Sequence, residues 1–208
     1  MTNLLVPYYE HPAHRPAEWA ALIEAAPHLY GVVLNPASGP GRAPDPAFAE
    51  VAAELRRAGV RVLGYTDTDY ARRPHAEVVA DLLRHQEWYG ADGAFLDQVA
   101  TEHHRLPHYR RLALAARAAG ARTLVLNHGT APHPEYAELA DVLVTFEGTW
   151  ETYTRQRPPG TRPGTLLCHL VYDAPADALV TADLHCAVPG AGAHPWGTLP
   201  HALRTVAR

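Results

Sequence analysis

The sequence predicts an α/β protein, and more narrowly a compact (β/α)₈ barrel, on three observations. Eight short apolar runs alternate with alanine-rich stretches of helical length along the 208 residues. The runs are continuously apolar, which is typical of parallel strands covered on both faces. The first run leads into PYYE, and no GxGxxG or GxxxxGK loop is present. The doubly wound open sheet, the main alternative, usually has such a loop, so the barrel is favoured.

Each expected element has a local signal. Several helices open with proline in the first turn, and glycine follows two of them, as is usual at helix ends. The expected strands are Leu4–Tyr8, Gly31–Asn35, Val60–Tyr65, Gly93–Asp97, Arg122–Asn127, Asp141–Glu147, Thr165–Leu170 and, with the weakest pattern, Asp183–Val188. The expected helices are Glu18–Ala26, Pro46–Ala58, Pro74–Tyr89, Pro107–Ala119, Pro134–Ala140, Ala174–Thr181 and Leu199–Val206. The segment Gly190–Trp196 is expected to be a loop.

Composition limits the class of protein. With 47% hydrophobic and 19% charged residues, the chain can bury one substantial core, and a single domain over residues 1–208 is expected. A net charge of -4 without a long basic run argues against a nucleic acid or a membrane surface as partner, and a monomer is expected. Cys168 and Cys186 are expected to be buried thiols rather than a disulfide.

The N-terminal sequence MTNLLVPYYE lacks the basic flank and apolar stretch of a signal peptide, and no later run approaches a membrane span. As written, the chain is therefore expected to be cytoplasmic. It would be extracellular if it is a processed or truncated form.

In a barrel of this kind, the carboxyl ends of all strands open into one mouth, where chemistry is carried out. Asp97 and Glu147 end the fourth and sixth expected strands, so they are expected to face one another there. Such a pair can divide the work of glycoside hydrolysis, one acid acting at the anomeric carbon and the other protonating the leaving oxygen. The alternatives are a helix N-cap for Asp97 and an ion pair with Arg155 for Glu147.

Other side chains at or after strand ends could bind a polyhydroxylated ligand. Aromatic rings stack on sugar faces and amides bond hydroxyls, although tyrosines at a barrel rim can also be packing residues, and Asn35 and Asp67 are equally good turn formers. The candidate substrate-binding residues are Tyr8, Asn35, Tyr65, Asp67, Gln98, Asn127, Trp150 and His169.

The histidines raise a metal-dependent hydrolase as a rival class. His103, His104 and His108, with His128 and His169 near strand ends, are potential ligands. The first strand has no HxH pair, however, and the spacing of the first three histidines matches no established ligand motif. We therefore expect neither a metal nor another cofactor.

Six segments carry a family resemblance. In order, LLVPYYEHP, GVVLNPASGPG, VRVLGYTDTDYARR, WYGADGAFLDQV, LVLNHGTAP and ADVLVTFEGTWETY resemble the spherulin-4-like family, from Leu4 to about Tyr153. The resemblance implies a (β/α)₈ glycoside hydrolase. Its characterised relatives cut polymers of α-1,4-linked galactosamine and N-acetylgalactosamine, including fungal galactosaminogalactan, so an endo-acting enzyme on such a polysaccharide is expected.

The resemblance also implies roles at matching positions. The family's DE pair falls on Asp97 and Gln98, and its FEG glutamate on Glu147. Asp97 is then the nucleophile or charge stabiliser and Glu147 the general acid/base of a retaining reaction, with carboxyl groups roughly 5–5.5 Å apart. Gln98 departs from the family's acid, since glutamine carries neither charge nor a titratable proton. The chain is either retuned towards a neutral sugar or is a carbohydrate-binding barrel with impaired turnover.

Overall fold

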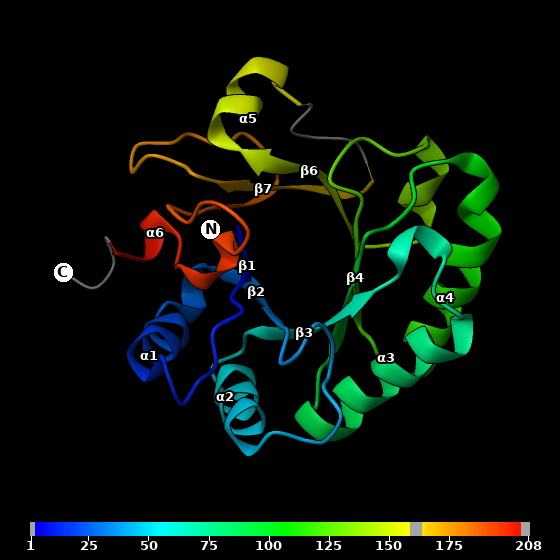
Figure 1. The fold of residues 1–208 in the computed structure, drawn as a ribbon, viewed down its shortest axis with the longest axis horizontal. Helices are drawn as coiled ribbons and strands as arrows, with labels where there is room; N and C mark the ends of the chain where they lie inside the picture. Colours follow the sequence, from blue (N-terminus) through cyan, green and yellow to red (C-terminus); the bar gives the residue numbers. More distant parts are fainter. Residues whose placement is uncertain (1–2, 159–163, 205–208) are drawn as a thin grey trace.

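The computed structural model describes residues 3–158 and 164–204, and eight parallel strands form a closed barrel in chain order (Figure 1). The first strand pairs with both the second and the eighth, which closes the ring. This confirms the predicted (β/α)₈ barrel. The strands are β1 (Leu4–Pro7), β2 (Leu29–Leu34), β3 (Arg61–Asp67), β4 (Gly93–Asp97), β5 (Thr123–Asn127), β6 (Val142–Thr149), β7 (Leu166–Tyr172) and β8 (Leu184–Ala187).

Four helices cover the outside of the first half of the barrel, and each begins and ends within two residues of its predicted bounds (Figure 1). Proline lies in the first turn of three of them, where its missing N–H costs no hydrogen bond. The helices are α1 (Pro16–Glu24), α2 (Pro46–Arg57), α3 (His75–Tyr89) and α4 (Leu106–Ala118). No helix within the described ranges is both long and apolar enough to cross a membrane.

One glycine lets a helix approach the barrel closely. A Cβ at Gly64 of β3 would lie 2.4 Å from Cγ of His85 on α3, so no larger residue fits without a shift. His85 also donates from Nε2 to the backbone carbonyl of Tyr65 at 2.6 Å. The helix thereby fixes the strand that carries Tyr65 to the barrel mouth.

The second half of the barrel has less helix than predicted. The expected helix Pro134–Ala140 is a 3₁₀ segment, η4 (Pro134–Glu138), and the expected helix Ala174–Thr181 is wrong, because this stretch is a turn and irregular chain. Pro175 disfavours helical geometry at the residue before it, and Ala174 instead donates to the Val188 carbonyl at 3.0 Å.

The remaining helical segments are short. Figure 1 shows α5 (Trp150–Gln156) lying over β6 and β7, with α6 (His201–Arg204) beside the N-terminal strand. The end of the expected helix Leu199–Val206 lies outside the described residues. Cys168 and Cys186 are buried free thiols on neighbouring strands, as expected.

Candidate active site

Two carboxylates at the barrel mouth share one amide donor. Asp97 ends β4, Asn127 ends β5 and Glu147 lies in β6, so three consecutive strands supply the three side chains. Asn127 donates from Nδ2 to Asp97 Oδ1 at 2.7 Å and to Glu147 Oε2 at 2.6 Å. A primary amide has two N–H groups, so one nitrogen can serve both acceptors. The nearest oxygens of the two carboxylates therefore lie within about 5 Å of each other.

The outer oxygens of the pair have their own donors. The Tyr65 hydroxyl donates to Asp97 Oδ2 at 2.7 Å, and Trp196 Nε1 donates to Glu147 Oε1 at 3.2 Å. The backbone N–H of Gly129 donates to Asn127 Oδ1 at 3.0 Å, which fixes the orientation of the shared amide. Each of the four carboxylate oxygens thus accepts a hydrogen bond.

The surroundings of the two acids differ. Burial raises the pKa of Asp97, but the Tyr65 hydroxyl, the backbone N–H of Gln98 and the Asn127 amide act in the opposite direction. Burial also raises the pKa of Glu147, and here the negative charge of Asp97 raises it further against the two bonds from Asn127 and Trp196. A neighbouring carboxylate raises the pKa of each acid, Asp67 for Asp97 and Asp97 for Glu147, but Asp97 has three hydrogen-bond donors and Glu147 has two. This arrangement favours an ionised Asp97 beside a protonated Glu147.

The pair lines a cleft with a volume of about 410 Å³. A second hollow of about 520 Å³ shares Tyr70 and His128 with it, so the groove continues over the loops after β3, β4 and β5. Cavities of this size hold small-molecule ligands. A larger hollow, about 670 Å³, lies between α1 and α2 and includes none of the predicted site residues. The cleft is lined by Tyr70, Asp97, Gln98, Asn127, His128, Gly129 and Glu147.

Tyr70 is a cleft residue that the sequence reasoning missed. It is 47% exposed and lies in a turn, Asp69–Ala71, whose three residues have φ values of 44°, 52° and 66°. Left-handed backbone is uncommon in residues other than glycine, and it concentrates at functional sites. The Tyr70 N–H donates to the Gln98 carbonyl at 2.8 Å, and the Thr68 hydroxyl donates to the carbonyls of Asp97 and Gln98. The turn is thus bonded to the strand end that carries Asp97.

The prediction for Tyr8 is wrong by one residue. Tyr8 is 1% exposed and packs edge-on against Trp19 of α1, with ring centroids 5.2 Å apart. Tyr9 faces the site instead: its ring lies 5.7 Å from that of Tyr65, and burial together with the charges of Asp97 and Glu147 raises the pKa of its hydroxyl. Successive residues of extended chain point to opposite faces, so only one of the two tyrosines can point to the mouth.

The prediction for His169 is also wrong. The strand β7 continues to Tyr172, so His169 lies in its middle, fully buried, with Nδ1 3.2 Å from the Tyr153 hydroxyl. The register pairs His169 with Phe146, whereas Glu147 pairs with Leu170. Paired residues of neighbouring strands share a face, so His169 and Glu147 lie on opposite faces.

Trp150, another predicted substrate-binding residue, does not line the cleft and packs instead against Tyr153. It begins α5, and its ring stacks on that of Tyr153 with centroids 5.8 Å apart and planes at 21°. Phe146 and Val171 complete this group. The ion pair considered for Glu147 is not the one observed, because Arg155 pairs with Glu151 at 2.5 Å.

Three predicted residues act through the loops at the mouth. Asn35 Oδ1 accepts from the Gly39 N–H at 2.8 Å, and Asp67 Oδ1 accepts from the Asp69 N–H at 2.8 Å, so both serve as turn formers. Gln98 lines the cleft and has a left-handed φ of 50°. Its backbone supports both Tyr70 and Asp97.

Trp196 comes from the segment predicted to be a loop. The structure has a short 3₁₀ turn there, η5 (Pro195–Gly197), which brings the indole to Glu147. A Cβ at Gly190 would lie 2.0 Å from the Pro195 carbonyl oxygen, so glycine is required for this turn to pack. A lone tryptophan in a glycine- and proline-rich loop was the available signal in the sequence.

The fold and the site together define a (β/α)₈ barrel with a carboxylate pair at the mouth formed by the carboxyl ends of its strands. The family model "Spherulation-specific family 4" matches residues 3–195, and the chain belongs to this family. Spherulin-4 of Physarum polycephalum is 31% identical over 150 residues, which are 70% of this chain and 44% of that protein. The chain therefore spans less than half the length of this curated relative.

Solved structures share the barrel. Aspergillus clavatus Sph3 in complex with GalNAc matches with a TM-score of 0.84 and 24% identity, over 99% of this chain and 96% of that one. A chitinase from Chromobacterium violaceum matches with a TM-score of 0.52 and 16% identity, over 82% and 69% of the two chains. A maltogenic α-amylase, AmyB from Thermotoga neapolitana, matches with a TM-score of 0.53 and 9% identity, over 81% and 59%. At these identities the likeness establishes the fold.

Proposed function

We propose that this protein is a retaining, endo-acting glycoside hydrolase on polysaccharide of α-1,4-linked galactosamine or N-acetylgalactosamine units. The observation that carries the proposal is the amide of Asn127, which bonds both Asp97 and Glu147. It implies a carboxylate separation close to the roughly 5–5.5 Å of retaining enzymes, whereas inverting enzymes need about 6.5–9.5 Å to admit water. Family membership and the barrel shared with the GalNAc complex of Sph3 support an amino sugar as substrate.

In this mechanism, an Asp97 oxygen forms a bond to the anomeric carbon while the glycosidic bond breaks. The electron pair of that bond goes to the leaving oxygen, which takes the proton of Glu147. Glu147 then removes a proton from water, which attacks the anomeric carbon and releases Asp97. Tyr65 and Asn127 keep Asp97 ionised, and Trp196 orients Glu147.

Gln98 bears on the substrate. Its neutral amide in the cleft suits an N-acetylated unit, because it can hydrogen-bond an acetamido group but has no negative charge with which to form an ion pair with a sugar ammonium group. The second candidate function is a carbohydrate-binding barrel without turnover, and the loss of the family's acid at Gln98 favours it. Against it, the hydrogen bonds of Asp97 and Glu147 come from Tyr65, Asn127 and Trp196, and they are complete without an acid at position 98.

The test is incubation with galactosaminogalactan and with acetylated and deacetylated oligomers, with products read by mass spectrometry. We expect shorter oligomers from the parent, none from Asp97→Asn or Glu147→Gln, and full activity from Glu151→Gln, a matched control whose acid is exposed. NMR of the first product identifies the anomer, and an α-anomer is expected for retention.

Rescue by azide tests whether Asp97 is the nucleophile. An Asp97→Ala variant given azide should form a β-glycosyl azide, because the small anion enters the space left by the nucleophile. An inverted first product would contradict the retaining mechanism. Tight oligosaccharide binding without any product would favour the non-hydrolytic barrel, and activity abolished by a chelator would favour the metal-dependent class.

A further inference from the structure

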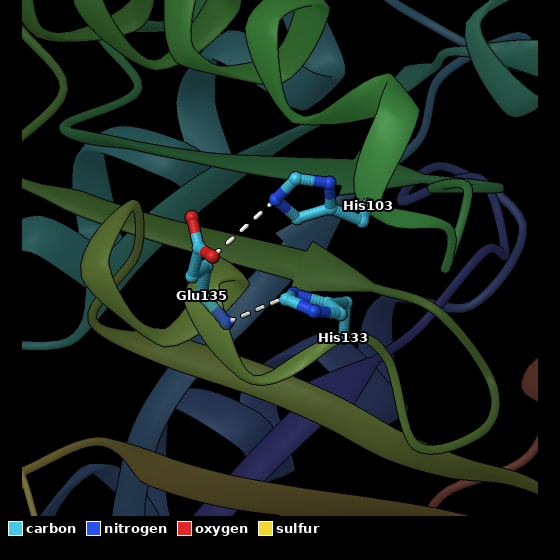
Figure 2. Close-up of side chains that lie close together, drawn as sticks. All are labelled: His103, His133 and Glu135. Carbon is cyan, nitrogen blue, oxygen red and sulfur yellow. Dashed lines mark hydrogen bonds and ion pairs between the residues drawn. The ribbon is translucent and has the colours of Figure 1, made fainter.

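Three potential metal ligands from two loops lie together outside the cleft. His103 belongs to η3 (His103–Arg105), which follows β4, and His133 and Glu135 lie at the start of η4, which follows β5. One ligand atom from each residue lies within 4.8 Å of the other two. Figure 2 shows the two imidazole rings and the carboxylate side by side, with His103 turned toward Glu135. None of the three residues lines the cleft of the carboxylate pair.

The distances suit a small tetrahedral ion. His103 Nε2 lies 3.3 Å from Glu135 Oε1, and the His103 and His133 ring centroids are 4.6 Å apart. A tetrahedral ion with bonds of about 2.0–2.1 Å holds its ligand atoms roughly 3.3 Å apart. One edge of the tetrahedron is therefore already present. The side chain of His103 is 63% exposed and that of Glu135 43%, so both can rotate to close the other edges.

The backbone around the cluster is already braced. The His133 N–H donates to the Thr101 carbonyl at 2.9 Å, and the Tyr136 hydroxyl donates to the Glu102 carbonyl at 3.1 Å. These bonds tie the two loops together next to the three side chains. The main chain of both loops is therefore already ordered, so the entropy lost on binding an ion comes mainly from fixing the three side chains.

The competing contacts of these side chains are weak. Arg110 lies 3.7 Å from Glu135 Oε2, which leaves Oε1, the oxygen nearest His103, available. The Glu135 N–H reaches His133 Nδ1 at 3.4 Å, longer than an ordinary hydrogen bond of this kind. Losing this contact on metal binding would cost little.

We propose that His103, His133 and Glu135 bind one divalent transition-metal ion, best matched by zinc, which cross-links the loops after β4 and β5. Two imidazoles and one carboxylate are a donor set that zinc accepts, with a fourth position open to water. Magnesium and calcium prefer sets made of oxygen alone. The two loops begin next to Asp97 and Asn127, so the ion stabilises the loops that follow these two cleft residues. The proposed hydrolysis itself uses the carboxylate pair and not the ion.

The test measures zinc binding to protein first stripped of metal with a chelator and then dialysed free of it. Isothermal titration gives stoichiometry and affinity, and the visible absorption of bound Co²⁺ reports a tetrahedral ligand set. The chain has 14 histidines, so variants are essential. His103→Ala and Glu135→Gln remove one ligand each. His104→Ala is the matched control, because this neighbouring exposed histidine is not in the cluster.

We expect one zinc ion per parent chain, a loss of affinity of at least ~10-fold in both ligand variants, and unchanged affinity in the control. Zinc should raise Tm in the parent and the control in a concentration-dependent way, and much less in the ligand variants. Zinc affinity that is equal in parent and ligand variants would place the ion on other histidines and overturn the proposal. Absence of stoichiometric binding by the parent would also overturn it.

Discussion

The two sides of the barrel mouth differ in how their side chains reach it. On the β3 to β6 side, Tyr65, Asp97, Asn127 and Glu147 come from consecutive strands and form one hydrogen-bonded network. On the side of β1, β7 and β8, the predicted site residues Tyr8 and His169 point away from the mouth and are buried. Tyr9 and a late turn carrying Trp196 supply that side instead.

The difference teaches that a site residue is located by the face of its strand as much as by the strand's end. The expected sixth strand ended at Glu147, two residues before the observed end of β6 at Thr149. Glu147 was still placed on the correct face, because residues two apart in a strand point to the same face. Choosing Tyr8 over Tyr9, or His169 over its neighbour Leu170, is an error of one residue, and an error of one reverses the face.

The largest expected effect tests the two faces of the chain after β1. Tyr8→Ala should cost about 3–5 kcal/mol in the free energy of unfolding, because it leaves a cavity against Trp19. Tyr9→Phe, which keeps the ring beside Tyr65, should change stability by less than about 1 kcal/mol and act on sugar binding instead. Urea unfolding and oligosaccharide titration of both variants measure this, and equal losses of stability would erase the distinction.

Asn127→Ala should have the next largest effect, in this case on activity. It removes the donor shared by Asp97 and Glu147, and because these bonds lower the pKa of both acids, both pKa values should rise. Activity needs an ionised Asp97 and a protonated Glu147, so both limbs of the pH profile should move to higher pH. We expect kcat/KM to fall by roughly 10²–10³. An unshifted profile would show that the amide does not control either proton.

Trp196→Phe tests the other side of the mouth and should have a smaller effect. It keeps an aromatic ring but removes the N–H that bonds Glu147, so the pKa of Glu147 should rise and the alkaline limb should move to higher pH. A loss of about 10-fold in kcat/KM is expected for one such bond. Gly190→Ala should shift the same limb by displacing the turn. A change in KM alone would assign Trp196 to binding rather than to proton transfer.

The prediction with the smallest expected effect on the active site concerns how stability depends on pH. Burial lowers the pKa of His85 and of His128 to about 4, so both histidines are neutral in the folded protein. Unfolded histidine titrates near pH 6.5, so below that pH the unfolded chain binds more protons. Stability should therefore fall as the pH drops from about 6.5 towards 4, by up to about 3 kcal/mol for each group.

Thermal unfolding of the parent and of His85→Gln across this range measures the slope, with His104→Gln as the exposed control. The slope should be shallower in His85→Gln and unchanged in the control. Parallel slopes in all three proteins would assign the acid sensitivity to other groups.

The sequence by itself determined the barrel, the first four helices and the two acids. Apolar runs and the proline and glycine at helix ends act through local sterics, which do not depend on the rest of the fold. The acid at the end of β4 and the one in β6 followed from strand position together with the family resemblance.

Only the tertiary structure decided which of two neighbouring residues faces the cleft, and that Trp196 reaches Glu147 across 49 residues of chain. It also decided that the Asp69–Ala71 turn places Tyr70 in the cleft and that the His103 ring contacts the His133 ring. These outcomes depend on register between strands and on the packing of distant loops, because each contact is made between segments whose own local preferences do not specify their partner.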